Sequence, residues 1–531
     1  MELVYDSIHM EQKKWEAMTQ FTVEEDIELP SQNADMLELL LEDVQCFVEE
    51  TKVAREQVVV KGAIKYQVLY ATANETGMDR IQASIPFEEV IHAKGAVPGD
   101  MPVVKAVVED FHISRINPRK IELQSIVMIF ARMCEEKTQG CPADLRLSKE
   151  KESVETYIDR QEIYQLKQKK QDILRIKEEI ELQTGYQPIG KLLWHSVALR
   201  ELEARPMDGK ISVSGEFECF FIYETTGVKA SVKTLSKKVP FQKLLDSSAC
   251  DSDRYVNVLP TQTQTSVEVK EDYDGEDRIF FMEASMDMNI HIYATSEVQV
   301  LKDAYSTNQE LLLEKEKLQI PTLILSGTGK TKIKESKRVR DTSPKIMQHI
   351  YTSAVLFPEK EEWDEGNLQL MGGVQVQTLY ATAETQMPYG VLQAMIPYSF
   401  TMEARNVAAT DHCNISVEPY IEKVEAIVRE SEEVEWRVVL SFAALAVGEK
   451  SIESVSNVIA QDLDLEAYAA IPSMSVCFVD ETMPLWEIGK AHYMAVSDIR
   501  KINEINTDEM RERKQVLLVK GSYEDGKNID V

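Results

Sequence analysis

Apolar and polar residues alternate in three long stretches of the chain. The apolar positions run from Val58 to Tyr70, from Ile211 to Tyr223 and from Leu368 to Tyr380. Alternate side chains of a β-strand point to the same face, so this period of two predicts a strand with one buried face. The three stretches are similar enough to indicate an internal repeat.

Each of these strands carries a glycine at the same inward position. Gly62, Gly215 and Gly372 are separated by 153 and 157 residues. A glycine inside a strand is typical of a bulge or a bend, or of a close approach by a neighbouring chain. We therefore expect each strand to be interrupted or bent at its glycine.

The repeat extends to both sides of these strands. The opening strands of the copies align as VEEDIELP (23–30), IKEEIELQ (176–183) and IKESKRVR (333–340). A short motif with a proline and an aromatic residue follows each glycine, as IPF (85–87), VPF (239–241) and IPY (396–398). Each copy is long enough for its own two-layer core, and a period this long indicates tandem domains rather than a solenoid.

The sequence therefore predicts three mainly-β, sandwich-like tandem repeats followed by a smaller module. We place the repeats at residues 15–135, 165–295 and 325–447. The stretches near 135–165 and 295–320 are charged and are expected to be connectors with room for short helices. Residues 448–472 are expected to form an acidic, irregular linker with few contacts, and residues 473–521 the final module.

The final module is expected to fold as a strand, two helices and a strand. The strands are predicted at 476–479 and 516–519. Pro484 suits the first position of a helix, and Ser497 can cap the second helix. The side chains expected to face the module core are Leu485, Ile488, Ile499 and Ile502, with His492 as an additional candidate.

The charge of the chain limits its partners. The 531 residues include 90 Asp and Glu against 59 Lys and Arg, which gives a net charge of −31. Phosphates require cationic surface, so nucleic acid and anionic lipid are not expected as main partners, whereas basic protein surfaces are compatible. We find no apolar segment of signal-peptide or membrane-spanning length, and the seven cysteines are scattered. These features predict a cytoplasmic protein without an integral membrane segment and with free thiols.

The sequence contains no convincing catalytic or metal-binding motif. SGTGKT at 326–331 resembles the end of a phosphate-binding loop, but Ile324 occupies the position that requires glycine. We interpret this stretch as a turn between repeats. DHC at 411–413 places three potential ligands together, but adjacent residues of an extended loop point apart and no fourth ligand is evident. We therefore expect no enzymatic activity, no metal and no cofactor.

The final module resembles a LysM domain over its whole length. The similar segments are LWEI in the first helix, VSDIRKIN with its terminal Asn503 in the second helix, and QVLLV in the last strand. Two loops depart from the family pattern. The Gly-Asp-Thr before Leu-Trp is replaced by Thr482, Met483 and Pro484, and the Pro-Gly before the last strand by Arg513 and Lys514. In glycan-binding members these loops line the groove for N-acetylglucosamine chains, so the departures make a protein ligand a better expectation than a glycan.

The candidate binding surface consists of the loops of this module. Methionine adapts its shape and is common at protein-binding surfaces, and a Met–Pro pair suits an apolar protein contact better than sugar hydroxyls. The candidate binding residues are Glu481, Thr482, Met483, Pro484, Trp486, Ile505, Asn506, Thr507 and Asp508.

The three repeats resemble the SPOCS domain, a β-rich module associated with spore coats. The alternating strand that contains the glycine, followed by the IPF-type motif, carries this resemblance. The combination with a C-terminal LysM domain resembles clostridial coat-morphogenesis proteins, which implies a non-enzymatic scaffold of the mother-cell cytoplasm. The implied partner is the basement-layer ATPase of the spore coat, to which the scaffold is recruited at the forespore surface. The alternatives are a glycan-binding wall or cortex protein, a wall hydrolase anchored by LysM, and a multidomain β protein with another ligand.

Overall fold

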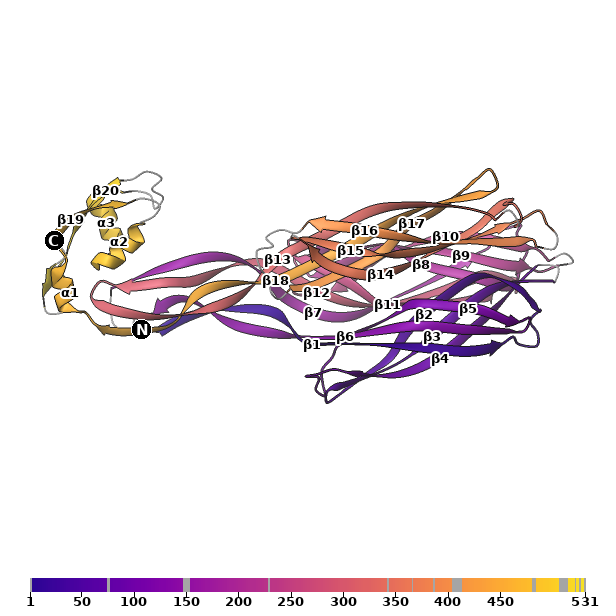
Figure 1. Ribbon diagram of the computed structural model, residues 1–531, viewed down its shortest axis with the longest axis horizontal. Helices are drawn as coiled ribbons and strands as arrows, with labels where there is room; N and C mark the ends of the chain where they lie inside the picture. The colour runs from indigo at the N-terminus through magenta and orange to yellow at the C-terminus, as the bar shows by residue number, and fades with distance from the viewer. Residues whose placement is uncertain are drawn as a thin grey trace.

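The computed structural model describes most of the chain. The described residues are 2–73, 77–146, 153–227, 230–340, 343–364, 366–384, 387–403, 413–479, 484–505, 514–520, 522–524 and 527–529. Three β units lie side by side, a narrow stalk extends from them, and the C-terminal module lies at the far end of the stalk (Figure 1).

Within the described residues, each unit contains six strands. Unit 1 comprises β1 (Glu2–Glu28), β2 (Met36–Ala54), β3 (Gln57–Thr72), β4 (Met78–His92), β5 (Val103–Asn117) and β6 (Lys120–Arg146). Unit 2 comprises β7 (Val154–Glu181), β8 (Ile189–Met207), β9 (Lys210–Thr225), β10 (Val232–Asp246), β11 (Tyr255–Glu271) and β12 (Asp277–Ser306). Unit 3 comprises β13 (Gln309–Arg338), β14 (Gln348–Asp364), β15 (Asn367–Ala381), β16 (Tyr389–Glu403), β17 (Cys413–Arg429) and β18 (Glu433–Asp462).

The three units share one topology. In unit 1, the strands pair as β1-β6-β5 in one sheet and β2-β3-β4 in the other, and units 2 and 3 repeat this order. All pairs are antiparallel. The two sheets enclose one core, to which β3 contributes Val60 and Ile64 and β6 contributes Leu123 and Val127. The expectation of tandem β repeats is confirmed.

The inward glycines make room for the aromatic residue of the following motif. The directly paired residues are Gly62 with Phe87, Gly215 with Phe241, and Gly372 with Tyr398. A Cβ atom on Gly215 would lie 2.7 Å from Cζ of Phe241. The expected irregularity lies on the neighbouring strand, where β2, β8 and β14 each shift register beside the glycine. The glycine and the aromatic residue are thus two halves of one packing arrangement.

This arrangement predicts a strong coupling between Gly215 and Phe241. Gly215→Ala should cost about 1–2 kcal/mol of unfolding free energy through overpacking. In a Phe241→Ala background the same change should cost less than about 0.5 kcal/mol, because the next nearest heavy atom, the carbonyl oxygen of Arg200, lies 3.4 Å from the added Cβ. Denaturant unfolding of the full chain measures both costs. If Gly215→Ala cost the same unfolding free energy in the wild type and in the Phe241→Ala variant, the proposed packing of Phe241 on Gly215 would be wrong.

Gly62 provides the matched comparison. A Cβ atom there would collide with the backbone carbonyl of Phe47 as well as with the ring of Phe87. Removing the ring by Phe87→Ala cannot relieve the contact with the backbone. Gly62→Ala should therefore remain destabilising in both backgrounds.

Equivalent residues of the three units meet on a common axis. One buried cluster contains side chains from β2 and β3, from β8 and β9, and from β14 and β15. The equivalent sets are Leu40, Leu193 and Ile350; Leu41, Trp194 and Tyr351; and Leu69, Ile222 and Leu379. The units are therefore related by an approximate threefold arrangement, as subunits are in a cyclic trimer.

Contacts around this axis close a ring. Gln67 of unit 1 donates from Nε2 to the carbonyl of His195 in unit 2 at 3.0 Å. Its equivalent in unit 2, Phe220, stacks on Tyr351 of unit 3 with ring centroids 4.3 Å apart. Its equivalent in unit 3, Gln377, donates to the carbonyl of Glu42 in unit 1 at 2.8 Å. Each unit therefore contacts the next, and unit 3 returns to unit 1.

The first and last strands of each unit extend beyond the sandwich and form the stalk. Three antiparallel ribbons, β1–β6, β7–β12 and β13–β18, pack against one another there. The buried residues of the main stalk cluster are Ile8, Met10, Cys141, Ile163, Val298, Val300, Leu318, Ile320 and Ile452. The units are thus held together at the stalk as well as at the axis.

Three predictions from the sequence are wrong in the region of the stalk. Where the structure describes them, the stretches near 135–165 and 295–320 are strands of the stalk without helices. Residues 448–462 continue β18, and a short helix, α1 (Leu465–Ala470), follows them in place of an irregular linker. In β12, Glu297 and Gln299 are exposed beside the buried Val298 and Val300, so the stretch is rich in polar and charged residues and resembles a connector in sequence.

The stretch SGTGKT (326–331) is also not a turn. It lies within β13 and pairs with residues 440–445 of β18. Its glycines therefore belong to a sheet, and no helix follows them. No helix in the described part of the chain is long and apolar enough to cross a membrane.

Candidate functional site

The C-terminal module has the expected order of elements. β19 (Met474–Val479) is followed by α2 (Leu485–His492), α3 (Val496–Asn503) and β20 (Lys514–Val519), and β19 pairs with β20 in antiparallel fashion. A short hairpin, β21 (Ser522–Glu524) and β22 (Lys527–Ile529), follows. The core of the module contains Leu485, Ile488, Met494, Ile499, Val516 and Leu518.

Asn503 connects the second helix to the last strand. Its Nδ2 donates to the carbonyls of Ile499 and Leu517, both at 2.8 Å, and its Oδ1 accepts from the backbone N–H of Leu517 at 2.7 Å. The side-chain amide thus forms with the backbone of Leu517 the two hydrogen bonds that a residue of a neighbouring strand would form. Asn503 therefore has a structural role at the end of α3.

Three details of the module differ from expectation. Pro484 is the N-cap residue of α2, whose first residue is Leu485. Ile502 is 41% exposed, because Asn503 and not Ile502 turns towards β20. Ser497 does not cap α3, since the helix begins at Val496 and its N-cap residue is Ala495. His492 is partly buried, with Nδ1 3.0 Å from the carbonyl oxygen of Ile488.

The structure describes three of the nine predicted binding residues. Pro484 is exposed and forms the N-cap of α2, Trp486 is partly buried, and Ile505 packs against the module core. Trp486 faces the stalk. The others, Glu481, Thr482, Met483, Asn506, Thr507 and Asp508, lie outside the described residues.

The module is attached to the stalk through Asp303 of β12. Asp303 is only 8% exposed. Its two carboxylate oxygens lie 2.7 Å from Nζ of Lys490, and Oδ2 accepts from Nε1 of Trp486 at 3.1 Å. Two residues of α2 thus share one carboxylate of unit 2. Charge-assisted hydrogen bonds of this kind are stronger than neutral ones.

Aromatic residues surround this ion pair. The ring of Trp486 contacts Tyr157 of β7 and Tyr305 of β12, with centroid distances of 5.4 and 4.9 Å. The hydroxyl of Tyr305 donates to the carbonyl of Met494 at 2.7 Å. A Cβ atom on Gly489 would approach the carbonyl of Met494 to 2.9 Å, and would also lie only 2.5 Å from the Tyr305 hydroxyl oxygen. The glycine therefore permits α2 to lie directly on the stalk.

The electrostatics of the contact keep Asp303 ionised. Burial raises the pKa of Asp303, but the hydrogen bonds from Lys490 and Trp486 together with the Lys490 charge lower the pKa below its ordinary value. A carboxyl group with a lowered pKa stabilises the folded arrangement above its unfolded pKa, and this stabilisation is lost as the pH falls through the lowered value. The contact should therefore be intact at neutral pH.

Sequence reasoning did not identify Asp303, Tyr305 or Tyr157. All three lie in stretches that we expected to be connectors, and no local motif distinguishes them from other charged and aromatic residues. Their importance arises from the length of β7 and β12, which brings them to the end of the stalk.

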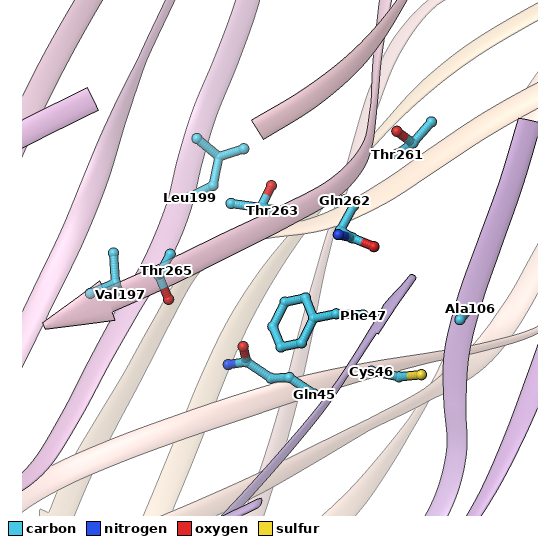
Figure 2. Close-up of a pocket in the computed structure, with 10 residues that line it drawn as sticks. All are labelled: Gln45, Cys46, Phe47, Ala106, Val197, Leu199, Thr261, Gln262, Thr263 and Thr265. Carbon is cyan, nitrogen blue, oxygen red and sulfur yellow. The ribbon is translucent and has the colours of Figure 1, made fainter. Parts of the chain in front are cut away.

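A pocket lies between units 1 and 2, with a volume of about 290 Å³. Figure 2 shows its lining, which consists of Gln45, Cys46, Phe47, Ala106, Val197, Leu199, Thr261, Gln262, Thr263 and Thr265. Gln262 also connects the two units, since its Oε1 accepts from the N–H of Val48 at 2.7 Å and its Nε2 donates to the carbonyl of Val48 at 3.2 Å. Burial raises the pKa of Cys46 to about 12, so its thiol is protonated and weakly nucleophilic.

One carboxyl group and one imidazole group with a strongly shifted pKa lie at contacts between units. Burial raises the pKa of Glu42 to about 7, and burial together with the Arg80 charge lowers the pKa of His195 to about 4. Both belong to the ring of contacts around the axis and do not line the pocket. Within the described ranges, no group of three or more His, Cys, Asp or Glu residues is placed to hold a metal ion.

The fold defines a protein of three tandem two-sheet β units that carries a small module on a stalk. Residues 35–116 and 188–270 match the family model described as SipL, SPOCS domain. These segments correspond to β2–β5 and β8–β11, and β14–β17 of unit 3 has the same strand order. No curated protein and no solved structure matches the chain.

Proposed function

We propose that the protein is a non-enzymatic structural adaptor in endospore coat assembly. The observation that carries this proposal is the match of two segments, 35–116 and 188–270, to the SPOCS domain model. In this proposal the C-terminal module is a LysM domain that binds the basement-layer ATPase of the spore coat. The adaptor acts in the mother cell and is recruited to the forespore surface.

The architecture supports an adaptor role. The three units are joined at the axis and along the stalk, so they form one extended body. The module lies at one end of this body and the sandwiches at the other (Figure 1). Such a separation allows the two ends to contact different components of an assembly.

The test is binding of the full chain to the purified coat ATPase, measured by calorimetry. Met483→Ala and Asn506→Ala should each weaken binding about tenfold, which corresponds to about 1.4 kcal/mol. Tyr273→Ala is the control, because Tyr273 is fully exposed in a turn of unit 2. Neither the wild type nor the variants should bind chitin oligomers or peptidoglycan at millimolar concentration.

Two outcomes would contradict the proposal. If both loop variants bind the ATPase as tightly as the wild type does, the ATPase site does not lie on the module loops. Saturable binding of oligosaccharide that is weakened by the same variants would favour a wall or cortex glycan as the ligand.

A further inference from the structure

The geometry points to a composite binding surface in which the stalk contributes Tyr157 beside Trp486 of the module. This inference rests on the proposed function, since it concerns the surface that the module offers to its protein partner. It adds a residue of unit 2 to a site that was expected to belong to the module alone.

Tyr157 is exposed at the junction between stalk and module. Its side chain is 51% exposed, and its ring centroid lies 5.4 Å from that of Trp486 with an interplanar angle of 42°. Pro484, two residues before Trp486, is also exposed. The two aromatic rings thus lie beside one another, although one comes from β7 and the other from the start of α2. Tyrosine and tryptophan are enriched among the residues that dominate binding energy at protein interfaces.

The aromatic pair is held in place before any partner arrives. The indole N–H of Trp486 donates to Asp303, and Lys490 from the next turn of α2 pairs with the same carboxylate. Trp486 also contacts Tyr305, whose hydroxyl donates to the carbonyl of Met494. These contacts fix α2 on the stalk, and a preorganised surface loses less conformational entropy on binding.

The surroundings of the pair favour a basic partner. Glu155, two residues before Tyr157 on β7, has a pKa that is raised by burial and by the charge of Asp498, against the smaller opposite effect of Arg500. Glu487 is exposed in the first turn of α2. Lys490 is engaged by Asp303, and the chain carries a net charge of −31. The surface therefore fits a protein segment that presents an apolar side chain to the rings and basic groups to their acidic surroundings.

The experiment titrates the purified coat ATPase into full-length variants at two salt concentrations. Tyr157→Ala should weaken binding at least tenfold, whereas Tyr157→Phe, which keeps the ring, should stay within twofold of the wild type. Binding should weaken further when the salt concentration rises from 50 to 300 mM, because salt screens the attraction between these acidic groups and a basic partner. Tyr273→Ala again serves as the exposed-tyrosine control.

Hydrogen exchange of α2 separates a contact from a structural effect. Asp303→Asn should increase exchange in α2 and weaken binding, whereas Tyr157→Ala should weaken binding with α2 still protected. If Tyr157→Ala binds normally while Met483→Ala does not, the composite surface is wrong and the proposed function stands. If the wild type fails to bind the ATPase, both are overturned.

Discussion

Replacing Trp194 with alanine should loosen all three units at once. Trp194 is 2% exposed and belongs to the cluster on the axis, where its equivalents in units 1 and 3 are Leu41 and Tyr351. Loss of a buried tryptophan typically costs about 3–5 kcal/mol through lost burial and the cavity left behind. Because side chains of every unit line this cavity, hydrogen exchange should increase in β2–β4, β8–β10 and β14–β16.

Trp436→Ala provides the matched control. Trp436 is fully buried, but it lies inside the core of unit 3, where its Nε1 donates to the hydroxyl of Thr378 at 2.7 Å. Its removal should cost a similar free energy and should increase exchange mainly in unit 3. If Trp194→Ala affected unit 2 alone, the units would be independent domains and the closed ring would be wrong.

Shortening the chain to residue 447 should destabilise the stalk strongly. Residues 448–462 of β18 pair with residues 309–322 of β13, and they supply Ile452 and Val455 to the buried clusters of the stalk. Losing these two side chains and one strand of a ribbon should cost about 4 kcal/mol or more. It should also make residues 309–322 sensitive to proteases, because their backbone groups lose their partners.

A chain that ends at residue 462 is the control for this truncation. It keeps the whole of β18 and loses only α1 and the module, whose contacts with the stalk are centred on Asp303, Tyr305 and Tyr157. Thermal unfolding of its three units should lie close to that of the full chain. Equal stability of the two shortened chains would contradict the role of the stalk ribbon.

The β units could be predicted from sequence because their strands have one buried face. The alternation around Gly62, Gly215 and Gly372 identified the repeats, and the downstream motif contained the aromatic residues that pack on these glycines. The pairing of the two features was not predicted, since it depends on the register between neighbouring strands.

The stalk and its contact with the module could not be predicted in the same way. In the stalk, charged and polar residues such as Glu297 and Gln299 are interspersed with buried ones such as Val298 and Val300, so β7 and β12 continue through stretches that look like charged connectors. The role of Asp303 depends on a partner, Lys490, that lies 187 residues later in the chain. The order of elements in the module was predictable because Leu485 and Ile488 share one face of the first helix at helical spacing.

The most direct test of the account compares two ligands on the same protein. The full chain is titrated by calorimetry with the purified coat ATPase and, separately, with chitin oligomers, and the chain that ends at residue 462 is titrated in parallel. The account predicts saturable binding of the ATPase by the full chain, its loss in the shortened chain, and no binding of the oligomers. Retained binding of the ATPase by the shortened chain, or saturable binding of the oligomers by the full chain, would contradict it.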